Sequence, residues 1–411
     1  MKYILIAIFC FLSLLTSCKG NNFKEELTEN KLFSLNYGNY EKEIYLFDLE
    51  NTKQIKTTHI MKDGLFYILN GESSKLIELN SYGDLLSIIY NETLNPQPEF
   101  INETNEKVNS ALEEQSGTST KIAVKYPFNN IGPHAVDNNK NIYIVDYLPA
   151  NRFEEDENNE SVLRQIVLKF APDGSFINYF TQDGLEGKPF SNIHSIHTNA
   201  NNELIVICFT EQQYTAYWFS QEGTLINRYS INKSMITHAD VDLKNIDYVS
   251  LEQILPAYNK PILYLKFDYY DSTIDESTKI TSGVKFLKSV VYPLNVLTNT
   301  FERAISIPAY EKSIKKSYGT EIFLHPYTFL GTAQNGVLYF YITNEKGLAL
   351  LITNKNSKKI IEHQIEIPFN DSLYQYFSLS NNGILSALIA HEEKMDVSWW
   401  RTDSLLKDIE K

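Results

Sequence analysis

The sequence is poor in cysteine, with only three in 411 residues. Two of them, Cys10 and Cys18, lie near the N-terminus, so Cys208 is the single thiol of the remaining chain. One cysteine cannot form an intramolecular disulfide, which excludes a fold held together by disulfides. Cys208 lies in the apolar run Leu204–Phe209, which predicts a buried strand with an inert thiol rather than a nucleophile.

Basic residues are also scarce relative to acidic ones: 37 Lys and Arg face 51 Asp and Glu, a formal net charge of −14. Nucleic-acid binding needs clustered Lys and Arg, so the composition argues against a nucleic-acid partner. We interpret the negative charge as a source of solubility rather than as an acidic binding site. The hydrophobic content of 43% suffices for a sizeable core.

Long apolar runs are absent after residue 18, and the one that precedes it, Tyr3–Leu15, is too short to span a bilayer. Lys2 comes before this run and Leu15-Thr16-Ser17-Cys18 closes it, an arrangement typical of a cleaved signal peptide. The four closing residues resemble the lipobox of bacterial lipoproteins. An ordinary secretory signal with an incidental cysteine is the alternative interpretation.

The lipobox resemblance implies a location for the protein. It implies that the signal peptide, residues 1–17, is removed and that Cys18 receives lipid, whose several acyl chains give stable membrane anchoring. Residues 18–30 are polar and rich in Asn, so we expect a flexible tether there. We therefore expect an envelope protein anchored to the outer membrane, on either its periplasmic or its surface side.

Helical periodicity is hard to find in the rest of the chain, whereas strand formers are abundant, with 27 Tyr and 23 Phe. A turn pair repeatedly precedes a buried strand and a second strand and turn follow, which predicts antiparallel meanders of three or four strands. One meander cannot bury both of its faces, so the meanders are expected to stack around an axis as a β-propeller. The turn pairs are Asp63-Gly64, Asn139-Lys140, Asn201-Asn202, Asn335-Gly336 and Asn382-Gly383.

Six repeat units can be delimited, and the fourth has no clean turn pair. Two further N-terminal strands are expected, at Lys31–Leu35 and Glu43–Leu49. Because propellers usually close by strand exchange between the termini, we predict that residues 31–411 form one all-β domain, a six-bladed propeller. Seven blades are the alternative. The units span residues 59–90, 127–182, 193–232, 240–308, 322–368 and 373–409.

Two insertions interrupt the repeats. Asn91–Thr120 is polar, has no strand pattern, and is predicted to be an exposed loop that contributes little to the core and covers one face or contacts a partner. Asn151–Glu160 is an acidic extension of a hairpin. Both insertions are expected on one face of the propeller, where repeat proteins often bind their partners.

One segment carries a family resemblance. Residues 131–146 read Ile-Gly-Pro-His-Ala-Val-Asp-Asn-Asn-Lys-Asn-Ile-Tyr-Ile-Val-Asp, which resembles the Pro-x-Ala-Val-Asp, turn and Asn-Ile-Tyr-Val segments of an NHL-type repeat. The resemblance is clearest over 127–182, and the whole chain is similar to uncharacterised propeller lipoproteins of bacteria with two membranes. It implies a fold and a location. Such propellers bind partners more often than they catalyse, and the resemblance transfers no active site.

Histidines form the only candidate constellation. His59, His134 and His197 each lie seven or eight residues before the first core residue of a strand, so they could converge on the propeller axis and bind a transition metal. The alternative, which we favour, is that each histidine caps or fills its own blade turn. No metal-binding spacing accompanies them, so neither a metal nor another cofactor is predicted.

Searches for catalytic motifs identify no catalytic residue. There is no Gly-x-Ser-x-Gly elbow, phosphate-binding loop, calcium loop or sialidase box. Trp399 and Trp400 could suggest sugar stacking, but alternation along a strand turns only one of them outward. We interpret them as core or rim packing.

The sequence predicts a monomeric, lipid-anchored binding module for a protein, peptide or glycan. The alternative is an envelope glycan hydrolase or lyase that uses carboxylates in the central funnel. A funnel with carboxylates or histidines of perturbed pKa would favour the enzyme. A face lined by apolar or Tyr side chains would favour binding.

Overall fold

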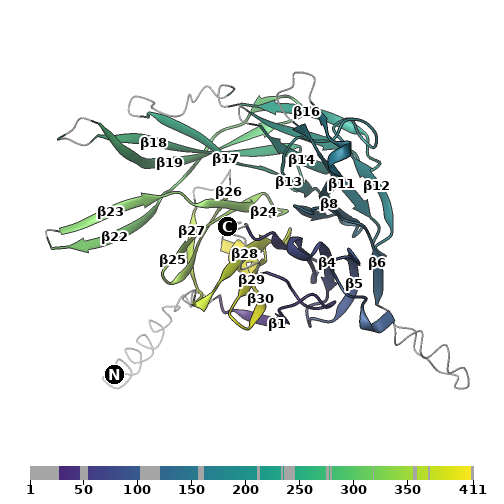
Figure 1. The fold of residues 1–411 in the computed structure, drawn as a ribbon. Helices are drawn as coiled ribbons and strands as arrows, with labels where there is room; N and C mark the ends of the chain where they lie inside the picture. The colour runs from purple at the N-terminus through teal and green to yellow at the C-terminus, as the bar shows by residue number, and fades with distance from the viewer. Residues whose placement is uncertain are drawn as a thin grey trace, which may run out of the picture.

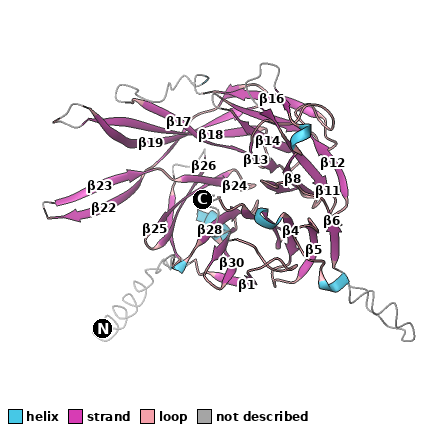
Figure 2. Ribbon diagram, in the orientation of Figure 1, coloured by secondary structure: helices cyan, strands magenta, loops and turns pink. Residues whose placement is uncertain are grey.

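The computed structural model describes residues 27–46, 54–101, 121–155, 162–210, 213–232, 235, 246–274, 277, 280–317, 319–354, 359–368 and 371–408. Over these residues the chain forms six antiparallel meanders of four or five strands, arranged as blades around one axis (Figure 1). Strands make up most of the molecule and its helices are short (Figure 2). The predicted six-bladed β-propeller is confirmed.

The first three blades follow the predicted repeats. Blade 1 contains β2 (Thr57–Lys62), β3 (Leu65–Asn70), β4 (Lys75–Leu79), β5 (Leu85–Tyr90) and an added parallel strand, β6 (Ile122–Lys125). Blade 2 contains β7 (His134–Val136), β8 (Ile142–Tyr147), β11 (Gln165–Phe170) and β12 (Phe176–Phe180). Blade 3 contains β13 (Ile193–Thr198), β14 (Leu204–Phe209), β15 (Tyr214–Phe219) and β16 (Leu225–Ile231).

The last three blades show more variation. Blade 4 contains β17 (Tyr248–Pro256), β18 (Ile262–Ile274), β19 (Thr281–Asn295), β20 (Thr300–Phe301) and β21 (Ile305–Ile307). Blade 5 contains β24 (Thr328–Thr332), β25 (Val337–Asn344), β26 (Gly347–Asn354) and β27 (Ile361–Glu366). Blade 6 contains β28 (Tyr374–Leu379), β29 (Leu385–Ala390), β30 (Lys394–Trp400) and β1 (Asn30–Asn36). Short 3₁₀ helices occur at Gly71–Ser73, Ala150–Arg152 and Thr402–Asp408.

Blade 6 closes the ring with strands from both ends of the chain. β1 pairs antiparallel with β30, so the predicted N-terminal strand becomes the outer strand of the last blade. The second predicted strand, Glu43–Leu49, is wrong over its described part. Ile44 is buried and forms only an isolated bridge with Tyr37, because this segment turns back beside β1 instead of extending. Residues 47–49 lie outside the described residues.

The core consists of six apolar clusters, one between each pair of neighbouring blades. Strand alternation explains this arrangement. In β8, Ile142 and Ile144 pack toward blade 1, while Tyr143 and Val145 pack toward blade 3. Each central strand is therefore apolar on both sides, which is why these strands read as continuous hydrophobic runs in the sequence.

The strand order gives the propeller two different faces. The first strand of every blade is innermost, and the turns between first and second strands all lie on one face, which we call the turn face. Asp63-Gly64 is such a turn, and its φ angles of 52° and 79° suit a tight hairpin. The opposite face, which we call the mouth face, carries the connections between blades and between second and third strands.

Both predicted insertions leave the sheets at the mouth face. Glu154–Glu155 (β9) pairs with Val162–Leu163 (β10) at the base of the acidic hairpin, whose residues 156–161 lie outside the described part. In the longer insertion, residues 102–120 are not described. Its first ten residues correct the expectation of an insertion outside the core: Phe100 is buried between blades 6 and 1, and Asn95 Nδ2 donates to the Ser73 carbonyl at 2.6 Å.

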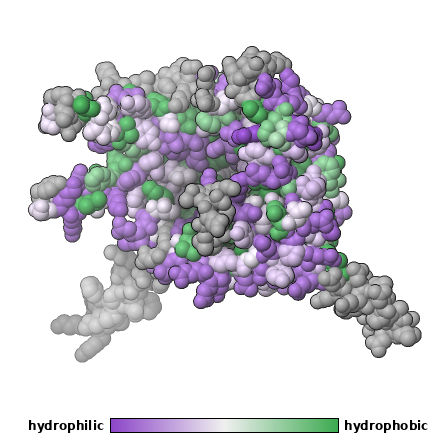
Figure 3. Space-filling model, in the orientation of Figure 1, coloured by the Kyte–Doolittle hydropathy of each residue, from purple (hydrophilic) through white to green (hydrophobic). Residues whose placement is uncertain are grey.

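Two hairpins that the sequence analysis did not delimit project from blades 4 and 5 (Figure 1). One is the distal part of β18 and β19, and the other is formed by β22 (Tyr310–Lys316) and β23 (Gly319–His325). They expose apolar side chains, among them Ile274, Val284 and Ile322. Green, hydrophobic side chains are visible on both projections in Figure 3, where the surrounding face is mostly polar.

Two further sequence expectations can be located in the blades. Cys208 lies in β14 as a buried free thiol, and burial raises its pKa, which makes the thiolate form unfavourable. Trp400 is fully buried in the cluster between blades 5 and 6, while Trp399 is partly buried. The predicted lipidation residue Cys18 and the predicted signal peptide lie outside the described residues. Within the described chain, no helix has the length and hydropathy needed to cross a membrane.

Candidate functional site

A cavity of about 700 Å³ lies along the propeller axis. Residues of the first strands of blades 1, 2, 3, 5 and 6 line it, namely β2, β7, β13, β24 and β28. The exposed lining residues all lie where these strands begin; they are Gln54, Lys56, Asn192 and His194. The cavity therefore opens on the mouth face, and the ends of the innermost strands form its floor.

The floor is backed by a ring of hydrogen-bonded turns on the turn face. The bonds link five consecutive blade junctions and join Lys140 to Asp63, Asn138 to Asn202, Ala200 to Tyr258, Asn259 to Gln334 and Gln334 to Asn381. Tyr258 of blade 4 also reaches blade 2, where its hydroxyl donates to Asn138 Oδ1 at 2.7 Å. This side chain thus crosses beneath the cavity and connects blades that are not adjacent.

His59 and His134 tie neighbouring blades together. His59 Nε2 lies 2.8 Å from Ser386 Oγ of blade 6, and His134 Nε2 lies 3.0 Å from the Tyr67 carbonyl of blade 1. Both side chains are buried, with 0% and 6% exposure. Each histidine therefore bonds the second strand of the preceding blade. This arrangement differs from both expectations, in which the histidines bind a metal together or each fill the turn of their own blade.

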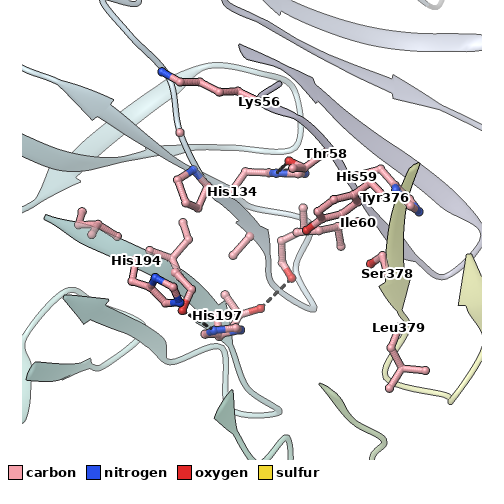
Figure 4. Close-up of a pocket in the computed structure, with 18 of the residues that line it drawn as sticks. Lys56, Thr58, His59, Ile60, His134, His194, His197, Tyr376, Ser378 and Leu379 are labelled. Atoms are coloured by element: carbon pink, nitrogen blue, oxygen red, sulfur yellow. Dashed lines mark hydrogen bonds between the residues drawn. The ribbon is translucent and has the colours of Figure 1, made fainter. Parts of the chain in front are cut away.

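His197 and His194 lie on another wall of the cavity, opposite Tyr376 and Ser378 in Figure 4. His197 Nε2 is 3.0 Å from Ser195 Oγ, a distance that suits a base and a nucleophile. Within the described part of the chain, no carboxylate bonds the other ring nitrogen of His197. The third group that would orient the imidazole in a catalytic triad is missing there.

All four cavity histidines have lowered pKa values, and burial is the main cause in every case. The pKa falls to about 3 for His59 and to about 4 for His134 and His197. The neighbouring imidazoles add to the effect, His134 on His59 and His194 on His197. These rings are therefore neutral at pH 7 and act as hydrogen-bonding groups.

The predicted candidate metal ligands His59, His134 and His197 do share this cavity. The first two already bond neighbouring blades, and His197 bonds Ser195. Among the described residues, no group of three or more His, Cys, Asp or Glu is arranged to hold a metal ion. Two of the three histidines that line the cavity thus serve to join blades. The binding properties of the cavity depend on its other side chains.

The charge of the cavity differs from that of the whole protein. None of the described lining residues is Asp or Glu, although the chain carries a net charge of −14. Two lysines line it: Lys56 at the mouth and Lys62 at the floor. Sequence reasoning missed Lys62, because no motif or spacing marks a single lysine at the end of a strand.

Comparisons with known proteins add the following findings. No protein-family model and no curated protein matches the sequence. Among solved structures, polysaccharide lyase Uly1 is 8% identical, with 91% of this chain and 99% of that chain covered and a TM-score of 0.41. The β-propeller domain of the trilobed protease from Pyrococcus furiosus, described as having an open velcro topology, is 10% identical (85% and 95% covered, TM-score 0.37).

A putative exported protein from Bacteroides fragilis is 12% identical, with 92% of this chain and 98% of that chain covered and a TM-score of 0.39. These similarities are too low to carry an argument about function. The class of the protein follows from its own sheets, which define a six-bladed β-propeller with an axial cavity.

Proposed function

We propose that the protein is a binding propeller of the bacterial envelope whose axial cavity holds a small polar ligand, a glycan or a peptide fragment. The carrying observation is the cavity itself: about 700 Å³, within the range of about 300–1,000 Å³ usual for ligand pockets. Its wall includes polar groups that have no hydrogen-bond partner in the described chain, such as the hydroxyl groups of Tyr376 and Ser378. Such groups favour a ligand rich in hydrogen-bonding oxygens.

The enzyme alternative has less support from the same cavity. A glycosidase of the usual kind needs two carboxylic groups beside the scissile bond, and the described lining supplies none. Histidines of lowered pKa would by themselves favour an enzyme, but burial accounts for these shifts and two of the rings are occupied by contacts between blades. Ser195 and His197 are the remaining catalytic candidate, without a described orienting group.

Lipid anchoring at Cys18 is part of this proposal. The described chain enters the propeller at the turn face, where Asn30 pairs with Trp399 at the end of β30. An anchor twelve residues before Asn30 would hold the protein by the side opposite the mouth. The mouth face would then point away from the membrane, toward incoming ligand.

The NHL-like character of blade 2 also belongs to the proposal. Two aspartates of the resembling segment hold turns in the structure. Asp137 accepts hydrogen bonds from the backbone and side-chain nitrogens of Asn141, at 2.9 and 2.7 Å. Asp146 accepts backbone N–H groups of Asn129 and Asn130. These hydrogen bonds support a structural role for the two aspartates of the motif, namely the stabilisation of turns, and no catalytic role.

Ligand binding can be tested with a substitution that fills the cavity. Ser378→Trp should block it, whereas Ile226→Trp, on the exposed outer strand of blade 3, is the matched control. We expect thermal-shift screening of soluble oligosaccharides and short peptides to find a ligand that stabilises the wild type and Ile226→Trp but not Ser378→Trp. A ligand that stabilises all three proteins, or no ligand at all, would contradict the proposal.

The same ligand separates binding from catalysis. After incubation with the protein it should be recovered unchanged by mass spectrometry. A product that is lost with Ser195→Ala would instead show a hydrolytic or lyase reaction at the cavity.

Anchoring is tested separately by metabolic labelling with a fatty-acid analogue. The wild type should be labelled and Cys18→Ser should not. Label retained on the variant would refute lipidation at this residue.

A further inference from the structure

The floor of the axial cavity contains a lysine whose side chain is mostly buried. Lys62 is the last residue of β2, lines the cavity and is only 6% exposed. Its Nζ lies 5.5 Å from the centre of the Tyr258 ring. Within the described ranges, no side-chain or backbone oxygen accepts a hydrogen bond from it. Its charge has a cation–π contact and the attraction of Asp63 and Asp137, but no hydrogen-bonded counter-ion, so it is incompletely compensated.

The acidic residues near Lys62 are engaged elsewhere. Asp63 pairs with Lys140, and Asp137 accepts two hydrogen bonds from Asn141. Both lie in turns of the turn face, and neither lines the cavity. Asp63 and Asp137 therefore attract Lys62 only from outside the cavity, and no described carboxylate lines the cavity beside it.

We infer that the ligand of the cavity carries a carboxylate, which pairs with Lys62 at the floor while its uncharged part lies against the polar groups nearer the mouth. The inference rests on the proposed function and specifies the chemical class of its ligand. It also gives a reason for the cavity's charge. An acidic protein that lines its axial cavity without described carboxylates avoids repelling an anion there.

The electrostatic surroundings make the interaction dependent on pH. Burial lowers the pKa of Lys62 to about 8; Asp63 and Asp137 oppose this shift and Lys140 adds to it. Tyr258 contacts the ammonium with the face of its ring. The cavity histidines His59, His134 and His197 stay neutral above pH 7, so they do not titrate in the same range.

The test uses D-glucuronate, D-glucose and succinate as probes in isothermal titration calorimetry at pH 7. Glucuronate should bind the wild type at least about tenfold more tightly than glucose, equivalent to one unit of log affinity. Lys62→Met keeps the aliphatic stem and removes the charge, so it should abolish this preference. Lys140→Met, which removes one positive charge beside the floor but outside the lining, is the matched control and should retain it.

Succinate distinguishes the sources of the carboxylate. Binding of both acids means that Lys62 recognises the carboxylate of sugar and non-sugar molecules alike, while binding of glucuronate alone means that the sugar ring is also required. Either result supports the inference if the Lys62→Met variant no longer binds the acids that the wild type binds. Wild type without saturable binding of either acid, or equal binding by wild type and Lys62→Met, overturns it.

The pH profile gives an independent measurement. With a pKa of about 8 in the free protein, Lys62 is mostly charged at pH 7 and mostly neutral at pH 9. The affinity of the wild type for glucuronate should fall about tenfold over this interval, and that of Lys62→Met should stay level. If Ser378→Trp blocks an uncharged ligand while Lys62→Met leaves the acids unaffected, the carboxylate inference fails and the binding function stands.

Discussion

The turn face and the mouth face of the propeller are built from different connections. On the turn face, short turns such as Asp63-Gly64 and Asn335-Gly336 are joined to one another by hydrogen bonds across five blade junctions. On the mouth face, both insertions leave the sheets, two hairpins project and the axial cavity opens. One face holds the ring together, and the other is free to vary and to bind.

The strand order is the physical reason for this division. In an up-and-down meander, the turns between first and second strands lie on one face, and the connections between second and third strands lie on the other. The connections between blades lie on this second face as well. A tight two-residue turn fixes the register of its strands, whereas a connection between blades only has to span the gap. Additional residues are therefore tolerated on the mouth face at little loss of stability.

The largest effect should come from opening the ring, which destroys both faces at once. Ending the chain at Asp371 removes the inner strands of blade 6 and leaves β1 without a partner. We expect aggregation through the exposed blade edges. Size-exclusion chromatography and thermal melting check this. Starting the chain at Leu27, which keeps every strand, is the control, and a truncated protein that melts like it would contradict ring closure by this segment.

A smaller effect should come from acid, through the histidines between the two faces. Their pKa values are lower in the folded than in the unfolded chain, so the unfolded state binds more protons between about pH 4 and 6.5. Stability is complete above pH 6.5 and falls as the pH drops through this window, by up to about 1.4 kcal/mol per pH unit for each of His59 and His134.

Urea unfolding at several pH values measures this slope. His59→Gln, which can still bond Ser386, should reduce it relative to the wild type. An unfolding free energy that stays constant between pH 7 and pH 5 would show that the buried histidines do not resist protonation.

Two glycines of the turn face provide a matched pair with a still smaller effect. Gly336 and Gly383 have φ angles of 78° and 82°, so alanine is strained at both by about 1 kcal/mol. A Cβ at Gly336 meets open space, but at Gly383 it lies 2.5 Å from the hydroxyl of the fully buried Tyr339. Denaturant unfolding should show a larger loss for Gly383→Ala. Equal losses would mean that the ring of turns is looser than its contacts indicate.

The smallest effect is expected in the longer insertion. Replacing residues 102–118 by a short Gly-Ser linker should leave the melting temperature nearly unchanged, because loop-closure entropy varies slowly with length. Phe100→Ala is the contrasting variant, since this side chain is buried between blades 6 and 1, and its loss should be about 3 kcal/mol. A large loss with the linker alone would show that the segment is an integral part of the fold.

Particular residues show how far the sequence could be interpreted. The turn pairs and the apolar strands that follow them predicted the blades, because both signals are local. β22 and β23 escaped notice since their exposed side chains, such as Lys315 and Ile322, do not form a buried strand pattern. The distal ends of β18 and β19 were missed for the same reason, since Ile274 and Val284 are exposed. Phe100 looked like an isolated apolar residue in a polar loop.

The candidate site was less accessible from the sequence. The sequence analysis grouped His59, His134 and His197, and all three line the cavity. The partners of His59 and His134, Ser386 and Tyr67, belong to other blades and could not be foreseen. Lys62 had no spacing or motif to mark it. Its position depends on Tyr258, which lies far away along the chain.

The sequence by itself determined the all-β class and the repeated meander, because hydrophobic alternation and turn residues act over a few positions. It favoured six blades over seven, and the structure settled the number. Only the tertiary structure decided which faces meet around the axis, that His59 and His134 join blades, and that Lys62 lies over Tyr258 at the floor of a cavity without described carboxylates. These contacts join residues of different blades, and their energies depend on distances and burial that exist only once the ring has closed.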